Sequence, residues 1–212
     1  MLKQIKWQTF PRDFAVIQIG FALFGLSIAC LIRSDLGTSP WVVFEVALLK
    51  FIPITPGQAG IMVGMGVLVI ALLLREPVGW GTMANIVFIG LWEDLSLKYL
   101  PRAQSFLPLQ ALYLALGVII MGSATAIYIG VNAGAGPRDS LMLAVARTTR
   151  RSVRLARTLV EIVVVTTGWL LGGPIGIGTL IFALAIGPAV QIGFRLFKVA
   201  PDAPQVVEAG TD

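Results

Sequence analysis

Arg138 and Asp139 stand side by side, directly after a proline, in a chain of which only 13% of residues are charged. A guanidinium can hold a carboxylate or a phosphate through two parallel hydrogen bonds, and a carboxylate beside it can orient it or take up a proton. A carboxylate at the third position of a helix can also simply stabilise the positive end of that helix. The pair therefore predicts either a site for an anionic group or a structural helix start, in which the two residues pair with each other.

Two glutamates, Glu45 and Glu161, lie inside apolar stretches, where an ionisable side chain needs a partner or a function. Glu161 has Arg157 one turn earlier on the same helix face, so a structural ion pair is the simpler interpretation. Glu45 has no basic residue one turn away, which favours a functional role for it. We expect Glu93 and Asp94 to lie at the membrane interface. The candidates for proton coupling are therefore Glu45, Asp139 and Glu161.

Two short breaks in the apolar sequence each end in a proline, at Gly37–Pro40 and at Gly134–Pro137. Proline suits the first position of a helix, with Ser39 or Gly136 as the N-cap residue before it. A helix N-terminus offers free N–H groups and a partial positive charge, which can bind an anionic group inside a membrane protein. The alternative is a turn whose glycines allow close packing. The predicted substrate-binding residues are Gly37, Thr38, Ser39, Pro40, Asn132, Gly134, Gly136, Arg138 and Asp139.

The two breaks occupy equivalent places in an internal repeat. An offset of 97 positions aligns Phe24–Leu100 with Met121–Phe197 without a gap. Helices share leucine and valine by chance, but shared glycine and proline positions indicate a duplicated backbone. A tandem repeat in an apolar chain predicts a transporter whose site lies where the repeats meet. The arginine–aspartate pair has no charged counterpart in the first copy, since the offset places Trp41 and Val42 there.

The composition is that of a membrane protein, because 57% of the residues are hydrophobic. A soluble domain would carry about 25% charged residues. Six apolar stretches approach the ~20 residues that a helix needs to span a bilayer. They are Phe14–Ile32, Gly57–Leu74, Gly79–Trp92, Leu107–Val131, Leu155–Leu171 and Gly176–Phe197. The basic residues, which give a net charge of +5, sit in short loops and indicate contact with lipid headgroups rather than with nucleic acid.

We therefore predict an all-α polytopic membrane protein with two tandem repeats of four helical segments each. The second segment of each repeat, at Pro40–Phe51 or Pro137–Ala146, is a half-helix, because twelve helical residues cover only about 18 Å of a ~30 Å hydrocarbon core. Half-helices are tolerated at that depth only where neighbouring helices shield them. The predicted divisions are a basic N-terminus at 1–13, repeat 1 at 14–100, a linker at 101–108, repeat 2 at 109–198 and a disordered tail at 199–212.

Two topologies are compatible with this division. If all eight segments cross the membrane, the repeats run parallel to each other. If the short segments turn back, six segments cross and the repeats are inverted. The distribution of lysine and arginine slightly favours the first arrangement. Both arrangements place the two termini and the Arg147–Arg157 cluster in the cytoplasm.

Several residue types that enzymes need are missing. The chain has no histidine, which excludes Ser-His triads and histidine metal sites, and the single cysteine, Cys30, excludes thiolate clusters. The stretches Pro77–Thr82 and Pro174–Thr179 share the pattern Pro-x-Gly-x-Gly-Thr. They lack the lysine of a phosphate-binding loop and are interpreted as structural turns. The sequence therefore predicts no enzymatic activity, no cofactor and no metal.

Three stretches resemble the bacterial YczE-like membrane proteins, which are grouped with the YitT and YyaS proteins. They are Ser34–Trp41, Gly134–Asp139 and Gly172–Thr179. The resemblance extends from about Phe14 to Phe197 and implies a small multi-pass protein of the bacterial cytoplasmic membrane without a characterised catalytic activity. Some relatives are encoded beside antibiotic biosynthesis genes and are thought to assist production. YitT-type proteins add a cytoplasmic domain, which is not expected here.

These observations predict a small secondary transporter or exporter of a small anionic or zwitterionic solute, bound where the repeats meet. A homodimer is a further expected partner arrangement. The alternative is a non-transporting accessory protein that assists or regulates a biosynthetic or export partner, with the Arg147–Arg157 cluster as its docking surface. The lipid bilayer is the expected partner in either case.

Overall fold

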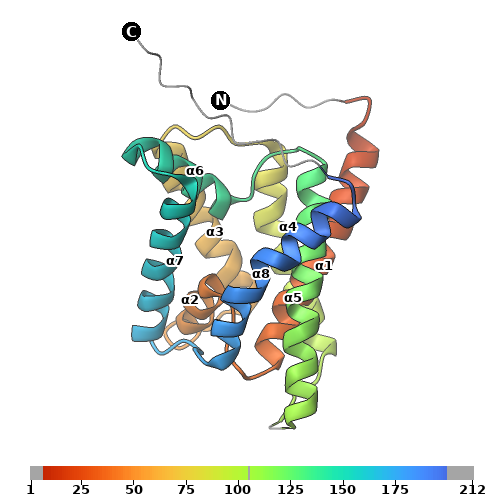
Figure 1. Ribbon diagram of the computed structural model, residues 1–212, viewed down its shortest axis with the longest axis vertical. Helices are drawn as coiled ribbons and strands as arrows, with labels where there is room; N and C mark the ends of the chain where they lie inside the picture. Colours follow the sequence, from red (N-terminus) through yellow and green to blue (C-terminus); the bar gives the residue numbers. More distant parts are fainter. Residues whose placement is uncertain (1–6, 105, 200–212) are drawn as a thin grey trace.

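The computed structural model describes residues 7–104 and 106–199, and this part of the chain folds into eight α-helices joined by loops (Figure 1). In each half, a long helix is followed by a short one and then by two long ones. The predicted all-α architecture, with a short second segment in each half, is confirmed. The helices are α1 (Phe10–Arg33), α2 (Pro40–Leu48), α3 (Pro56–Leu73), α4 (Trp80–Tyr99), α5 (Leu107–Gly130), α6 (Pro137–Thr149), α7 (Val153–Leu170) and α8 (Ile177–Leu196).

The helix ends differ from the predicted ones in a few places. α1 begins at Phe10, inside the segment 1–13 that was assigned to a basic N-terminus. α6 continues to Thr149, one turn beyond its predicted apolar part. It ends there because Arg150 takes a left-handed conformation. The predicted disordered tail at 199–212 lies, apart from Val199, outside the described residues.

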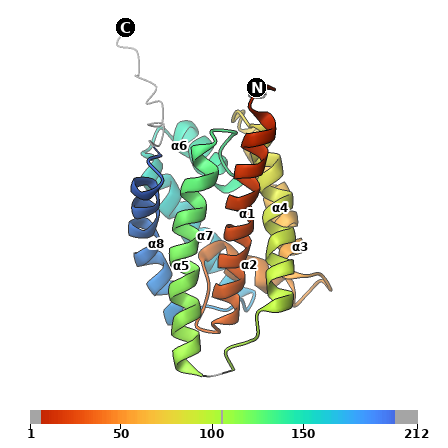
Figure 2. The same ribbon diagram turned by 90° about the vertical axis from the view of Figure 1, so that its right-hand side faces the viewer.

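The two halves of the chain run in opposite directions. The end of α1 meets the linker that precedes α5, where the Ala103 amide donates to the Arg33 carbonyl (3.2 Å). Toward the other end of the same helix pair, a Cβ on Gly20 would lie 3.1 Å from the Cβ of Tyr128. α1 and α5 are therefore antiparallel, and they stand side by side in Figures 1 and 2.

The short helices turn the chain back instead of carrying it across. α2 lies low and α6 lies high in Figure 1, where α1 descends and α3, which follows α2, ascends. The slight preference for eight crossing segments in parallel repeats is wrong. A helix of 9 residues is only about 14 Å long, so α2 returns the chain to the side from which it entered.

Four of the described helices are long and apolar enough to cross a membrane: α1, α3, α5 and α8. α4 and α7 carry more charge, but with 20 and 18 residues they are of similar length and stand among the others (Figure 2). Large apolar side chains also cover the outer surface, among them Leu73, Leu170 and Leu184. Such a surface is expected where hydrocarbon rather than water is the solvent. The chain is therefore a membrane protein.

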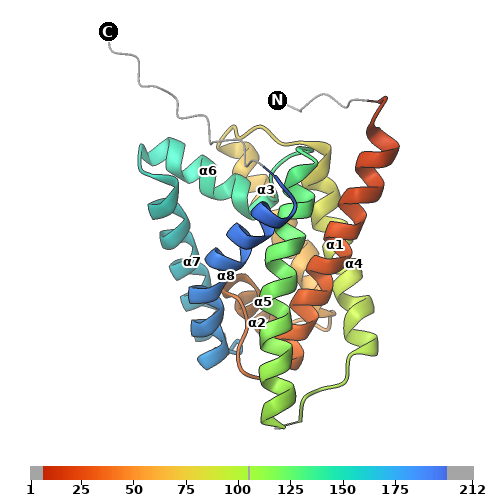
Figure 3. The ribbon, with the colours of Figure 1, turned by 45° about the vertical axis from the view of Figure 1, so that its right-hand side comes forward.

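The largest buried apolar cluster joins α1, α5 and α8 to the short helix α2, and Figure 3 shows α5 between α8 and α1. Its members are Ile28, Leu31, Val42, Leu114, Val118, Met121 and Phe182. Beside it, α1 approaches α4 closely, since a Cβ on Gly25 would lie 2.6 Å from the backbone nitrogen of Glu93. In lipid, close backbone approach of this kind replaces the hydrophobic force that packs helices in water. It fixes which face of α4 points inward.

Each break packs against the first turn of a helix from the other half. The Gly81 amide at the start of α4 donates to the Ala133 carbonyl (3.0 Å), and the Gly178 amide at the start of α8 donates to the Leu36 carbonyl (2.7 Å). The two bonds are equivalent in the repeat, because the offset of 97 positions pairs Gly81 with Gly178 and Leu36 with Ala133. A Cβ on Gly79 would collide with the Ala133 carbonyl, so glycine is needed at this approach. The two Pro-x-Gly-x-Gly-Thr stretches thus hold the breaks in place.

Candidate functional site

A cavity of about 710 Å³ is lined by residues from all eight helices. Small-molecule sites typically enclose about 300–1,000 Å³. Both breaks reach this cavity, through Ser39 and Pro40 at the start of α2 and through Gly136 and Pro137 at the start of α6. Ser39 and Gly136 occupy the predicted N-cap positions, but the Ser39 side chain makes no capping hydrogen bond and Gly136 has no side chain to make one. Two helix N-termini, each with a partial positive charge, therefore border one space.

Arg138 joins the two halves at this cavity. Its guanidinium forms an ion pair with Glu45 of α2 and lies over the ring of Trp41, 5.2 Å from the centroid. Arg138 thus pairs with a residue of the other half and not with the neighbouring Asp139. Glu45 is 1% exposed, so its charge has no access to solvent. One of its oxygens, Oε2, has no hydrogen-bond partner in the described part of the chain, and it remains available to a donor.

Glu93 of α4 is a second buried carboxyl group, 2% exposed and part of the cavity wall. A Cβ on Gly60 of α3 would lie 3.7 Å from Oε2 of Glu93 and 3.8 Å from Oε1 of Glu45, so both carboxyl groups approach the same glycine. Glu93 was expected at the membrane interface, and the structure buries its side chain among the helices, because the packing of α1 at Gly25 turns this face of α4 inward. The signal that could have found Glu93 is the repeat, since the offset pairs it with the uncharged Val190.

Asp94, the next residue, stabilises the start of α3. Its carboxylate accepts hydrogen bonds from the Gly57 amide (2.8 Å) and from the Thr55 hydroxyl. Thr55 in turn forms a capping box with Gln58. A negative charge at a helix N-terminus interacts favourably with the partial positive charge there. This contact therefore fixes α3 against α4.

Asp139 faces the cavity from the first turn of α6. The Tyr128 hydroxyl donates to its Oδ2 (3.1 Å). The side-chain amide of Asn85 lies at the same helix start, 3.6 Å from where a Cβ on Gly136 would be. Asp139 thus stands at the positive end of a helix and also within the cavity wall. This position suits both a structural role at the helix start and a role in the site.

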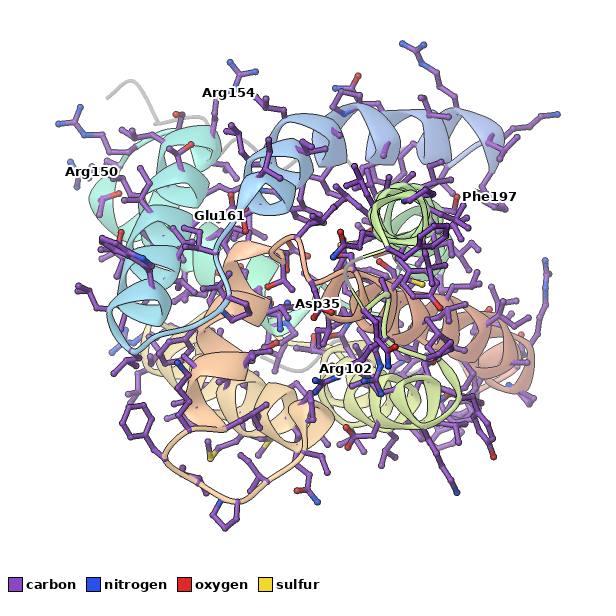
Figure 4. All side chains as sticks on the ribbon, turned by 90° about the horizontal axis from the view of Figure 1, so that it is seen from below. Asp35, Arg102, Arg150, Arg154, Glu161 and Phe197 are labelled. Carbon is purple, nitrogen blue, oxygen red and sulfur yellow. The ribbon has the colours of Figure 1, made fainter. Side chains whose placement is uncertain are left out.

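Glu161 and Arg157 form the ion pair expected for them, with Oε1 and Nε 2.9 Å apart. Both residues line the cavity from α7, together with Arg154 one turn nearer the start of that helix. Figure 4 shows Glu161 on the inner side of α7 and Arg154 extending outward from the rim of the molecule. Within the described residues, Arg154 makes no ion pair.

The predicted site residues fall into two groups. Those that line the cavity are Ser39, Pro40, Gly136, Arg138, Asp139 and Glu161. Glu45 reaches the cavity through its pair with Arg138. The remaining four, Gly37, Thr38, Asn132 and Gly134, are not part of the lining and instead build the turns. Gly37 and Gly134 have φ angles of 104° and 129°, a conformation that only glycine adopts without strain.

Charged groups of both signs surround the cavity. They are Arg138, Arg154, Arg157, Glu93, Asp139 and Glu161. Tyr128 and Asn85 add a hydroxyl and an amide to this lining. Guanidinium groups can hold a carboxylate or phosphate, and carboxylates can hold an ammonium group. The arrangement therefore suits an organic anion or a zwitterion.

A further ion pair joins α6 to a loop, outside the helices that span the membrane. Arg147, near the end of α6, pairs with Glu76 in the loop before α4 (3.1 Å) and donates to the Leu74 carbonyl (2.6 Å). Burial raises the pKa of the Glu76 carboxyl above its ordinary value, and the positive charge of Arg147 offsets part of that rise. The next arginines, Arg150 and Arg151, are exposed.

Three proteins are similar to the chain over most of its length. The uncharacterised membrane protein YczE of Bacillus subtilis is 32% identical over 167 residues, which cover 77% of this chain and 76% of that protein. An uncharacterised protein of Haemophilus influenzae is 27% identical over 198 residues, 93% of this chain and 90% of the relative. The uncharacterised protein YyaS of Bacillus subtilis is 29% identical over 167 residues, 77% of this chain and 83% of the relative.

No solved structure matches the chain. The resemblance to YczE-like bacterial membrane proteins is confirmed by the two Bacillus relatives. The family match extends from the second residue of α1 almost to the end of α8, so it takes in both breaks, the cavity and all of its charged residues. Through residues 11–195, the chain belongs to the family of unknown function DUF6198.

Proposed function

We propose that the chain is a small secondary transporter that carries an organic anion or a zwitterion through the central cavity, between two repeats of opposite orientation. The observation that supports this most directly is the Arg138–Glu45 ion pair, which links the two short helices beside a cavity of small-molecule size. Inverted repeats with broken helices at the substrate site are a recurrent architecture of secondary transporters.

The ion pair also suggests how binding is coupled to protons. An anionic group that reaches Arg138 replaces Glu45 as its partner. The displaced carboxylate is then buried beside Glu93 with no counter-charge, which is costly unless one of the two carboxyl groups takes up a proton. Substrate binding would therefore be linked to protonation of the Glu45–Glu93 pair. Asp139 and Glu161 are the next candidates for this role.

The test begins with ligand binding to the purified protein. Thermal unfolding is measured with a panel of amino acids and of small mono- and dicarboxylates, and stabilising compounds are then tested for counterflow in proteoliposomes. We expect at least one compound to raise Tm of the wild type and to be transported. The double variant Arg138→Gln/Glu45→Gln, in which neither partner of the ion pair is left alone, should fold but should lose both effects.

Arg195→Gln is the matched control, since it removes an exposed arginine from α8 outside the lining. It should bind and transport as the wild type does. A compound that stabilises all three proteins equally would contradict the site. Binding that depends on Arg138 without any counterflow would count against transport.

The same proposal assigns an orientation in the bacterial cytoplasmic membrane. The start of α1, the end of α8 and the turn between α6 and α7 lie at one end of the molecule (Figure 1). That turn carries Arg150 and Arg151, and an excess of such residues marks the cytoplasmic side. A Gln104→Cys variant, in the linker at the other end, should react with an impermeant maleimide in intact cells. Arg150→Cys should react only after permeabilisation, and the reverse pattern would invert the assignment.

The rival function is that of an accessory protein that docks a partner at the Arg147–Arg157 cluster. Its specific support is that Arg150 and Arg151 are exposed on a turn that the Arg147–Glu76 pair holds in place. The charge reversal Arg150→Glu/Arg151→Glu separates the two functions. An accessory protein should lose its partner in this variant, whereas a transporter that still inserts should keep its flux.

A further inference from the structure

The cavity is closed on one side and open on another. α3 and α4 close the first side, where a Cβ on Gly90 would lie 2.5 Å from the Gly57 carbonyl oxygen. The offset of 97 positions pairs Gly57 with Arg154 on α7, and Gly90 with Gly187 on α8. A Cβ on Gly187 would meet nothing within 4 Å. α7 and α8 diverge from the loop that joins them, as Figures 1 and 3 both show.

The side chains of α7 account for this opening. Glycines let α3 pack against α4, but the equivalent positions of α7 carry long charged side chains that cannot be buried in a backbone contact. All three of these side chains line the cavity. The pairs are Gly57 with Arg154, Gly60 with Arg157, and Gly64 with Glu161. The opening is therefore encoded in the sequence, because closure in the manner of α3 and α4 is sterically excluded.

The opening is lined by positively charged side chains at the start of α7 and by apolar side chains along α8. Four apolar residues of α8 recur every fourth position and line the cavity as one stripe: Phe182, Ile186, Val190 and Phe194. Their spacing covers about 18 Å along the helix, somewhat more than one leaflet of a ~30 Å hydrocarbon core. At the start of α7, Arg157 is neutralised by Glu161, whereas Arg154 has no ion-pair partner among the described residues.

We propose that this side cleft, defined by Arg154, Arg157, Gly187 and the apolar stripe of α8, binds an anionic phospholipid of the surrounding bilayer. The headgroup phosphate lies against Arg154 and Arg157, and one acyl chain lies along the stripe. Charge complementarity selects the lipid, since a headgroup with its own ammonium group would bring a second positive charge toward Arg154. Such a lipid seals the open side of the cavity whether or not a solute passes through it, so the inference does not depend on transport.

Native mass spectrometry of the protein tests this assignment, after reconstitution in equal amounts of phosphatidylglycerol and phosphatidylcholine with identical chains. We expect the wild type to retain one phosphatidylglycerol in preference to phosphatidylcholine. Arg154→Gln should lower that occupancy at least tenfold, and Arg154→Lys should largely restore it. The matched control is Arg151→Gln, which removes an exposed charge of the same sign outside the cleft and should keep the lipid.

A second pair of variants tests the apolar part. Gly187→Leu fills the cleft, and Gly66→Leu places the same side chain on α3, where a Cβ likewise has no neighbour within 4 Å. Only Gly187→Leu should lose the lipid, with size-exclusion chromatography showing that both variants remain folded. Equal retention of the two lipids by the wild type, or equal loss in Arg151→Gln and Arg154→Gln, overturns the proposal. So does a dimer that dissociates in Gly187→Leu with its lipid unchanged, which would assign the cleft to a second copy.

Discussion

The first half of the chain places two buried carboxyl groups at or beside the cavity and closes its own side, whereas the second half supplies the arginines and leaves its side open. Glu45 and Glu93 belong to the first half, and Arg138, Arg154 and Arg157 to the second. The backbone is nevertheless alike in both, down to the matching bonds between each break and the opposite helix start. The comparison teaches that glycine and proline set a common scaffold, while the charged side chains that differ between the halves make the cavity asymmetric.

The largest expected effect comes from breaking the pair that joins the halves. Arg138→Met alone should lower the free energy of unfolding by about 3–5 kcal/mol, because it leaves the Glu45 carboxylate buried without a counter-charge. The double variant Arg138→Met/Glu45→Met should recover most of that loss. Denaturant unfolding in detergent measures both. A double variant less stable than either single variant would show that the pair is not what couples the halves.

A smaller effect is expected from adding the same side chain to the two equivalent helix pairs. Gly90→Leu should destabilise the protein by about 1–3 kcal/mol or more, because its Cβ would lie 2.5 Å from the backbone of α3. Gly187→Leu should leave stability close to that of the wild type. Thermal unfolding of the two variants side by side checks the contrast. Equal losses would mean that α7 and α8 also close in the membrane.

Tyr128→Phe tests chemistry that only the second half has, since the offset pairs Tyr128 with Leu31. The substitution keeps the ring and removes the hydroxyl that donates to Asp139. A loss of about 1.5 kcal/mol is expected, as for a hydrogen bond to a charged acceptor. If the proposed site is correct, this variant should also bind a ligand of the cavity more weakly. A variant of unchanged stability would indicate that Asp139 finds another donor.

The smallest effect concerns the loop pair of Arg147 and Glu76. Arg147→Gln should cost at most about 1 kcal/mol near neutral pH, because Arg147 is partly exposed. Without Arg147, burial raises the pKa of Glu76 further. A pKa that is raised by folding means that the folded state binds the proton more readily, so stability should increase as pH falls through that pKa. Unfolding of both proteins is measured between pH 7 and pH 4. The stability lost by Arg147→Gln relative to the wild type should become smaller as the pH falls, and a loss that grows would contradict this.

Much of the architecture follows from local patterns in the sequence. Pro40 and Pro137 mark the starts of the short helices, and the apolar stretches locate the long ones to within a few residues. The ion pair between Arg157 and Glu161 could be predicted because both residues lie on one helix face. The residues that border the cavity at the two breaks were found in the same way.

Features that depend on long-range packing could not be read from such patterns. The partner of Arg138 lies 93 positions away, and only the antiparallel arrangement of the halves brings Glu45 to it. The same holds for Glu93, whose burial depends on the approach of α1 at Gly25. The direction of the repeats itself was not predictable from lysine and arginine alone, because the two topologies distribute these residues almost equally. The repeat alignment did pair Gly57 with Arg154. That this difference keeps α7 and α8 apart could be recognised only from the structure, in which the two helices diverge.

The reciprocal bonds between the breaks and the opposite helix starts have a consequence for biosynthesis. The Leu36 carbonyl is made early, but its donor, the Gly178 amide, leaves the ribosome only with α8, about 140 residues later. The first half therefore waits in the membrane with an incomplete turn until α8 has been made. Chains that stop before α8 would display that turn to quality-control proteases, whereas two separately expressed halves should assemble and protect each other.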